Sequence, residues 1–314
     1  MEIHNGVISS TTAVWDILVA SYNGDLKAVK QMVAACPELI YAQYNYTPPI
    51  HFAVREGHTD LVAYLLSEGA HDPAYRTYPF LESLLTVAQD RGYNEITSLL
   101  ENYYQDPAAC KYSKDNGAIH YDRSATQLEF QKAVNKGDID RTAQILKEHP
   151  EFAKDETYFW GEGILTMPAK GNNRPLMELL MSYGAEPPRI LKWAQFYYFE
   201  HYDSAVFLME HGMSANTMSW HHVTLLHDMA QKGHLQKAAL LIKHGAYINA
   251  LEDEYLSTPL GLAARWDHVE MVEYLLQQGA EPNESGAYWS TPLAWARKKG
   301  HLEIERVLVN AAAN

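Results

Sequence analysis

The chain has 314 residues, of which 47% are hydrophobic and 20% are charged, so it carries enough apolar surface for a folded core and is not a wholly disordered chain. Its 39 acidic residues outnumber its 25 basic ones, and the net charge of −14 argues against a nucleic-acid partner because it repels a phosphate backbone. The two cysteines, Cys36 and Cys110, are too few for a disulfide framework or a thiolate zinc site, so we expect a reducing, cytoplasmic location.

The N-terminal segment MEIHNGVISSTTAVWDILVASYNGD lacks a basic flank ahead of an apolar stretch. No later segment reaches the roughly eighteen uninterrupted apolar residues that a membrane-spanning helix needs. We therefore expect neither a signal peptide nor a role at a membrane.

The same short phrase returns along the chain at a spacing of about 33 residues. Its clear copies are NGDLKAV at 23–29, EGHTDLV at 56–62, KGDIDRT at 136–142, KGHLQKA at 232–238 and KGHLEIE at 299–305. Divergent copies begin at Arg91 and Trp266, and two degenerate units marked by Asn172 and Glu200 occupy the long gap between the third and fourth clear copies. An Ala-rich helix before each turn and a Leu-rich helix after it give about nine helix pairs, which are stable only when stacked.

The segment STPLGLAARWDHVEMVEYLLQQGAEPN at 257–283 resembles an ankyrin repeat almost position by position, and 48–70, 223–250 and 290–308 resemble it too. The resemblance is weakest around 156–216. It implies an all-α ankyrin-repeat solenoid with projecting hairpin loops, built from repeats at 11–101 and 127–310 with an insertion or linker at 102–126. In this family the hairpin tips and first helices line a concave surface that usually binds other proteins.

The fifteen histidines divide into two groups under this resemblance. It implies structural roles for six of them, four in the turns between helices and two capping first helices: His58, His234, His268, His301, His51 and His227. His221 and His222 differ, because they lie at a variable hairpin tip beside Trp220 and ahead of Asp228. Their spacing matches no established zinc pattern, so we expect no metal and no cofactor.

Aromatic residues give a second signal. Trp193, Phe196 and Tyr197 fall on slots that face the core. Tyr198, Phe199 and Trp266 fall on slots that normally hold polar, groove-facing residues, and Trp295 takes a variable groove position. Further aromatics lie at or beside the hairpin tips: Tyr46, Trp160, Trp220, Tyr255, Tyr288 and Trp289. An exposed aromatic wall favours binding, although tip aromatics could instead pack on one another and stiffen the hairpins.

Two functions follow, from different classes. The first is an interaction protein that holds a protein or peptide partner in the concave groove. The residues expected to bind this partner are Trp160, Tyr198, Phe199, Trp220, His221, His222, Asp228, Tyr255, Trp266, Trp289 and Trp295. The alternative is an enzyme or small-molecule receptor with an aromatic, acidic pocket in the degenerate repeats at 156–228. Its acid–base candidates, acting on a sugar-like or other ring-bearing ligand, are Glu162, Glu200, His222 and Asp228.

Overall fold

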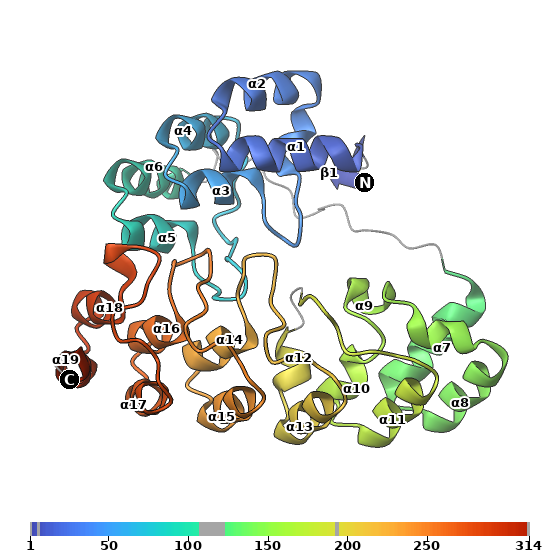
Figure 1. The fold of residues 1–314 in the computed structure, drawn as a ribbon. Helices are drawn as coiled ribbons and strands as arrows, with labels where there is room; N and C mark the ends of the chain where they lie inside the picture. Colours follow the sequence, from blue (N-terminus) through green and yellow to red (C-terminus); the bar gives the residue numbers. More distant parts are fainter. Residues whose placement is uncertain (1, 5–6, 107–122, 192–194, 313–314) are drawn as a thin grey trace. The chain divides into compact units, whose positions relative to one another are not determined.

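The computed structural model describes residues 2–4, 7–106, 123–191 and 195–312. The chain divides into two compact units, Met1–His120 and Tyr121–Asn314, and each is built from successive pairs of helices (Figure 1). The middle of the predicted insertion at 102–126 lies outside the described residues. None of the described helices is both long and apolar enough to cross a membrane.

The first unit opens with a short antiparallel pair of strands and continues as helix pairs. Its elements are β1 (Glu2–His4), β2 (Val7–Ile8), α1 (Thr11–Tyr22), α2 (Leu26–Ala35), η1 (Pro37–Tyr41), α3 (Pro49–Arg55), α4 (Thr59–Ser67), α5 (Leu84–Arg91) and α6 (Asn94–Gln105).

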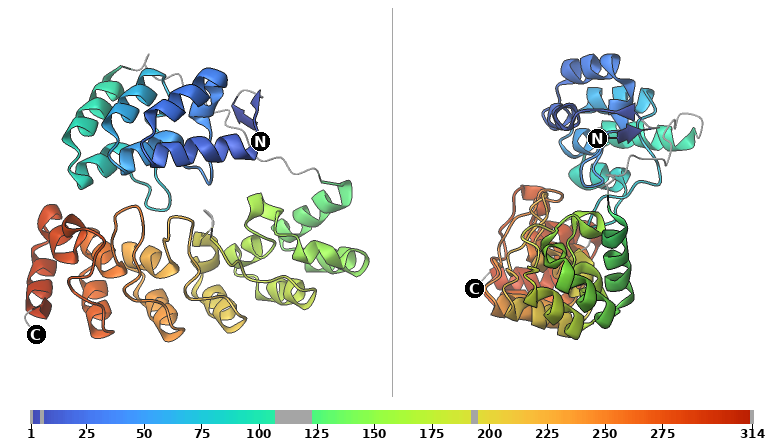
Figure 2. Two further views of the ribbon diagram at one scale, coloured as in Figure 1. Left: turned by 45° about the horizontal axis from the view of Figure 1, so that its top comes forward. Right: turned by 90° about the vertical axis from the view of Figure 1, so that its right-hand side faces the viewer.

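The second unit is a row of helix pairs with long loops between successive pairs (Figure 2). Its elements are α7 (Ala125–Lys136), α8 (Ile139–Glu148), η2 (Pro150–Lys154), α9 (Tyr158–Gly161), α10 (Thr166–Lys170), α11 (Arg174–Ser182), α12 (Gln195–Phe199), α13 (Tyr202–Glu210), α14 (Leu225–Gln231), α15 (Leu235–Lys243), α16 (Pro259–Arg265), α17 (Val269–Gln277), η3 (Tyr288–Ser290), α18 (Pro292–Lys299) and α19 (Leu302–Ala312). These pairs form the predicted all-α repeat solenoid, in which the number of ankyrin repeats stays a prediction.

Threonines fix the starts of the first helices in the last three pairs. The hydroxyl groups of Thr224, Thr258 and Thr291 each accept a hydrogen bond from an amide in the first turn of α14, α16 or α18. Such a cap satisfies one of the amides that a helix leaves without an intrahelical partner. Helices of seven or eight residues therefore begin at defined positions, which keeps the register between neighbouring pairs.

The turns between paired helices hold neighbouring repeats together. Gly24 has a φ of +71°, and a Cβ there would lie only 2.5 Å from Nδ1 of His58 in the next repeat. The Nε2 of His58 lies 2.8 Å from the carbonyl oxygen of Tyr22. A side chain at Gly24 would displace this ring, which explains why glycine and histidine recur together in the turn.

The same contact recurs in the second unit, where Nε2 of His268 lies 2.7 Å from the carbonyl oxygen of Gln231. His301 lies 3.2 Å from that of Arg265. The predicted structural role of these turn histidines is thus confirmed. The pattern changes at His234, an exposed residue. There Nζ of Lys237 donates to the carbonyl oxygen of Glu200 at 3.0 Å.

The two histidines that we expected to cap first helices differ, because α3 follows Pro48 and has no side-chain cap hydrogen bond, whereas His227 caps α14. Nδ1 of His51 lies 2.8 Å from the Tyr75 hydroxyl. In His227, Nδ1 accepts from the Thr224 amide at 3.1 Å, and Nε2 faces the carbonyl oxygens of Ala250 at 2.9 Å and Ser257 at 3.2 Å. The His227 ring is therefore held as the neutral tautomer with its proton on Nε2. Burial lowers the pKa of His227 to about 4.

We predict that His227 makes the second unit sensitive to acid. Between about pH 6.5 and 4, His227 binds a proton in the unfolded chain but stays neutral in the folded chain. The free energy of unfolding therefore falls as the pH drops across this range. A pKa lowered from 6.5 to about 4 corresponds to roughly 3 kcal/mol. Urea unfolding across this range should give a shallower pH dependence for His227→Gln than for the wild type. Parallel curves for the two proteins would contradict the assignment.

Candidate interaction surface at the hairpin fingers

Three loops of the second unit, here called the fingers, precede α14, α16 and α18 and comprise residues 214–224, 247–258 and 281–291. Their backbones touch. The Asp253 amide donates to the carbonyl oxygen of His221 at 3.0 Å, and the Gly286 amide donates to that of Leu256 at 2.7 Å. A Cβ at Gly286 would lie 2.8 Å from the Cβ of Leu256. Successive fingers are thus joined to one another rather than free.

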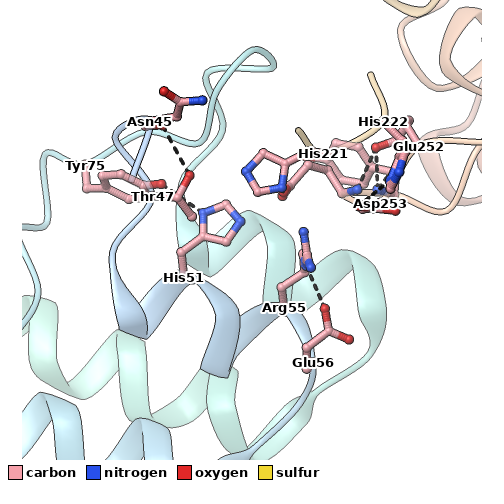
Figure 3. Close-up of polar contacts among 12 residues, drawn as sticks. Asn45, Thr47, His51, Arg55, Glu56, Tyr75, His221, His222, Glu252 and Asp253 are labelled. Atoms are coloured by element: carbon pink, nitrogen blue, oxygen red, sulfur yellow. Dashed lines mark hydrogen bonds and ion pairs between the residues drawn. The ribbon is translucent and has the colours of Figure 1, made fainter. Parts of the chain in front are cut away.

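The first two fingers also meet through side chains. Nδ1 of His222 lies 2.9 Å from Oδ2 of Asp253, and Nδ1 of His221 lies 3.3 Å from Oε1 of Glu254. We call residues 252–254 the acidic turn, and Figure 3 shows both histidines beside it. Each predicted tip histidine therefore has a carboxylate from the following repeat as its neighbour.

Glu252 organises the acidic turn from inside. Its carboxylate accepts hydrogen bonds from the amides of Glu254 at 2.6 Å, Tyr255 at 2.9 Å and Ser257 at 3.1 Å. Burial and the nearby charge of Glu254 raise the pKa of Glu252 to about 8, while these amide donors oppose the rise. The bonds hold the backbone of 252–257 in one conformation, so the turn keeps a defined shape.

A cluster of aromatic rings around one arginine lies below the last two fingers. The guanidinium carbon of Arg265 lies 3.9 Å from the ring centre of Trp266 and 4.3 Å from that of Tyr255. Tyr255 meets Trp295 edge to face at 5.8 Å, and Trp295 meets Trp289 at 5.7 Å. The guanidinium thus interacts with several ring faces at once, and part of the predicted aromatic wall packs on this chain's own cation.

Asp228 occupies an unusual position in α14. The equivalent positions of the next two first helices hold Leu262 and Trp295, whereas Asp228 places a buried carboxylate there. Its Oδ2 lies 2.8 Å from Nζ of Lys232. Burial raises the pKa of Asp228 and lowers that of Lys232, and the attraction between them opposes both changes. Removing Lys232 would leave the buried carboxylate of Asp228 without this compensating charge.

Several aromatic residues that we expected in the groove are buried instead. Tyr198 and Phe199 are 0% and 1% exposed, and Trp295 is 0% exposed. The Tyr198 hydroxyl donates to the carbonyl oxygen of Glu162 at 2.7 Å, and Nε1 of Trp295 donates to Oγ of Ser257 at 2.8 Å. The prediction that these three side chains are presented at the surface is therefore wrong. The polar atoms of Tyr198 and Trp295 have hydrogen-bond partners inside, and Phe199 is buried as an apolar ring.

The remaining predicted residues vary in exposure. Trp220, Trp266 and Trp289 are half-buried, Tyr255 is buried, and the His222 side chain is 58% exposed. Tyr288, at the tip of the third finger, is 90% exposed. The side chains of Trp160 and Phe196, and the whole of Trp193, lie outside the described residues.

The four acid–base candidates contact different neighbours. Glu162 is buried and accepts from Tyr198 through its carbonyl oxygen, while His222 pairs with Asp253. Asp228 and Glu200 share an electrostatic neighbour, Lys237, whose pKa burial lowers and both carboxylates raise. A catalytic role for these residues stays a prediction.

The acidic turn was missed by reasoning from the sequence. Glu252, Asp253 and Glu254 lie about one repeat length after Trp220, His221 and His222. Aligning the finger tips of consecutive repeats, rather than only their helices, would have placed the acidic run beside the histidines.

The repeated helix pairs define a helical-repeat solenoid, and comparison with known proteins gives its family. A model of the ankyrin repeat matches residues 46–78, and a model of three ankyrin repeats matches 193–286 and 226–314. The chain is an ankyrin-repeat protein.

Among its relatives, the ARF GTPase-activating proteins GIT2 of Rattus norvegicus and GIT1 of Homo sapiens are each 33% identical over 84 residues. These matches cover 27% of this chain and 11% of each relative. The ankyrin repeat and KH domain-containing protein mask-1 of Caenorhabditis elegans is 26% identical over 272 residues, which cover 83% of this chain and 10% of the relative. The chain thus spans about a tenth of the length of these relatives.

We predict that Arg265→Lys destabilises the second unit by about 1–2 kcal/mol. The planar guanidinium can stack on Trp266 and Tyr255, whereas the ammonium group of lysine is not planar and cannot. Urea unfolding followed by tryptophan fluorescence would measure the loss. The matched control is Arg297→Lys, whose side chain is 58% exposed and pairs with Glu305; its change should stay below about 0.5 kcal/mol. Equal losses for the two variants would show that the rings do not hold the guanidinium.

Proposed function

We propose that the chain binds a protein or peptide partner and that the tips of its fingers make the contact. Protein–protein interaction is the role that its ankyrin repeats indicate. The observation that carries the choice of surface is the exposure of His222 and Tyr288, at 58% and 90%, on fingers whose backbones are joined by hydrogen bonds.

A joined set of fingers suits recognition because its shape is fixed before the partner arrives. Binding then orders few additional groups, which lowers the entropic cost of association. Tyr288 offers a large ring with few rotatable bonds, and His222 with Asp253 offers polar contacts beside it. Aromatic anchors surrounded by polar groups are typical of binding hot spots.

The burial of Tyr198, Phe199 and Trp295 moves the proposed surface away from the floor of the groove. These rings stabilise the pairs and offer little area to a partner. Trp220, Trp266 and Trp289 remain half-buried, so they can contribute ring edges beside the tips. The names of the relatives record GTPase activation and a KH domain, but the chain covers too little of those proteins to carry either property here.

The test compares which proteins the full chain retains from a cell extract before and after the tip side chains are truncated. We expect His222→Ala with Tyr288→Ala to reduce retention of specific partners about tenfold or more, since each truncation at a hot spot costs about 1 kcal/mol or more. Quantitative mass spectrometry of the retained proteins gives the ratio.

The matched control is Tyr247→Ala, which removes a 70% exposed tyrosine from the base of the second finger. It should retain the same proteins as the wild type. An unchanged set of retained proteins with the double variant would refute the finger surface, and an equal loss with Tyr247→Ala would show unspecific aromatic adhesion.

A further inference from the structure

A groove of about 400 Å³ lies between the second helices α11 and α13, which are neighbours in the second unit (Figure 1). It is separate from the fingers, because its walls come from Asn172, Arg174 and residues of α13. These helices belong to the pairs whose sequences fit the repeat least well.

The groove opens where the repeat geometry changes. The turn position usually held by glycine is Asn172, which has a φ of +49°. The Ser204 hydroxyl lies 2.8 Å from Oδ1 of Asn172 and 3.1 Å from the carbonyl oxygen of Ala169. This tie fixes the start of α13 against the preceding turn.

The α13 side of the groove combines apolar and acidic groups. Tyr202 is 43% exposed, Val206 is half-buried and Phe207 forms the buried floor. Asp203 and Glu210 are exposed at the two ends of this strip. The spacing from Asp203 to Glu210 is two helical turns, so both carboxylates lie on the same face of α13 as the apolar strip.

The opposite wall of the groove contains a cation of this chain, Arg174, next to the aromatic floor. The guanidinium of Arg174 lies 5.2 Å from the Phe207 ring centre, and its Nε donates to Oε1 of Glu178 at 2.8 Å. Glu210 also attracts Arg174 electrostatically. The three carboxylates Glu178, Asp203 and Glu210 outnumber this one cation, so the groove keeps an excess of negative charge. The contact shows that an aromatic floor with nearby carboxylates accommodates a guanidinium here.

The acidic pair is particular to α13. The equivalent positions of α15, counted from the start of each helix, hold Gln236 and Lys243, so that helix offers no carboxylates there. In α17 the equivalent positions hold Glu270 and Gln277. A general acidic coat on the second helices would not produce this difference.

We propose that the α11–α13 groove binds a basic peptide segment of a protein partner. One arginine or lysine of the segment pairs with Asp203 and another with Glu210, and their aliphatic stems lie along Tyr202 and Val206. Charge complementarity selects this occupant, because the groove and the chain as a whole are both acidic. The site is exposed to water, so binding is moderate in strength and weakens as salt increases.

The test measures fluorescence anisotropy of a short labelled peptide of alternating arginine and alanine, titrated with the full chain at low salt. Asp203→Asn with Glu210→Gln should weaken binding about three- to tenfold, as expected for the loss of two exposed ion pairs. The control, Glu270→Gln with Glu273→Gln, changes the net charge equally on α17 and should weaken binding no more than about twofold. Equal losses in the two double variants would overturn the proposal, as would the absence of binding to the wild type.

A charge-neutral variant tests the apolar half of the groove. Tyr202→Ala should also weaken binding of the arginine peptide, whereas Tyr247→Ala should not, because Tyr247 lies outside the groove. A peptide with glutamate in place of arginine should not bind. Unchanged affinity with Tyr202→Ala would show that the peptide binds only through the general negative charge of the chain and not in the groove. Thermal unfolding of each variant should match the wild type, because the substituted side chains are exposed.

Discussion

The structure depends on one constraint: each helix is too short to be stable alone, so every pair needs its neighbours. Apolar residues of adjacent pairs supply most of the burial, and polar contacts between turns set the spacing. A first helix ends with carbonyl groups that lack partners within the helix. His58, His268 and His301 in the following turns hydrogen-bond such carbonyl groups. The recurring turn sequence is thus a device that both ends one helix and aligns the next repeat.

This dependence explains why the fold could be predicted well and the central repeats less well. Glycine, histidine and the leucine stripe recur because the stacking contacts recur, and this recurrence in the sequence predicts the helix pairs. In the pair containing α12 the contacts differ: Lys237 hydrogen-bonds the Glu200 carbonyl while His234 is exposed. Where the bond between a turn histidine and a carbonyl group is absent, the repeat does not require its consensus residues. The sequence there lacks the pattern that predicts which side chains face the core.

The errors at the candidate site have the same origin. Counting from a regular first helix predicts Tyr198 and Phe199 at the surface, but both rings are buried. Trp295 is predicted at a groove position but is buried, because Ser257 of the adjacent repeat offers a buried acceptor for its indole. Counting along one repeat cannot show what the next repeat places beside it. The acidic turn at Glu252 was missed for the same reason, since its relation to His221 and His222 exists only between fingers.

The two surfaces of the second unit differ in how their shape is maintained. At the fingers, amide groups of 254–257 close on Glu252, and the Gly286 amide reaches Leu256. Those bonds fix the backbone, so variation in the tip side chains can change the partner without changing the fold. At α11 and α13, by contrast, the groove lies beside an irregular turn, in which Asn172 takes the position that glycine usually holds. The acidic pair Asp203 and Glu210 belongs to α13 and not to the next two second helices. Recognition at the groove therefore depends on features in which this pair of helices differs from the repeat.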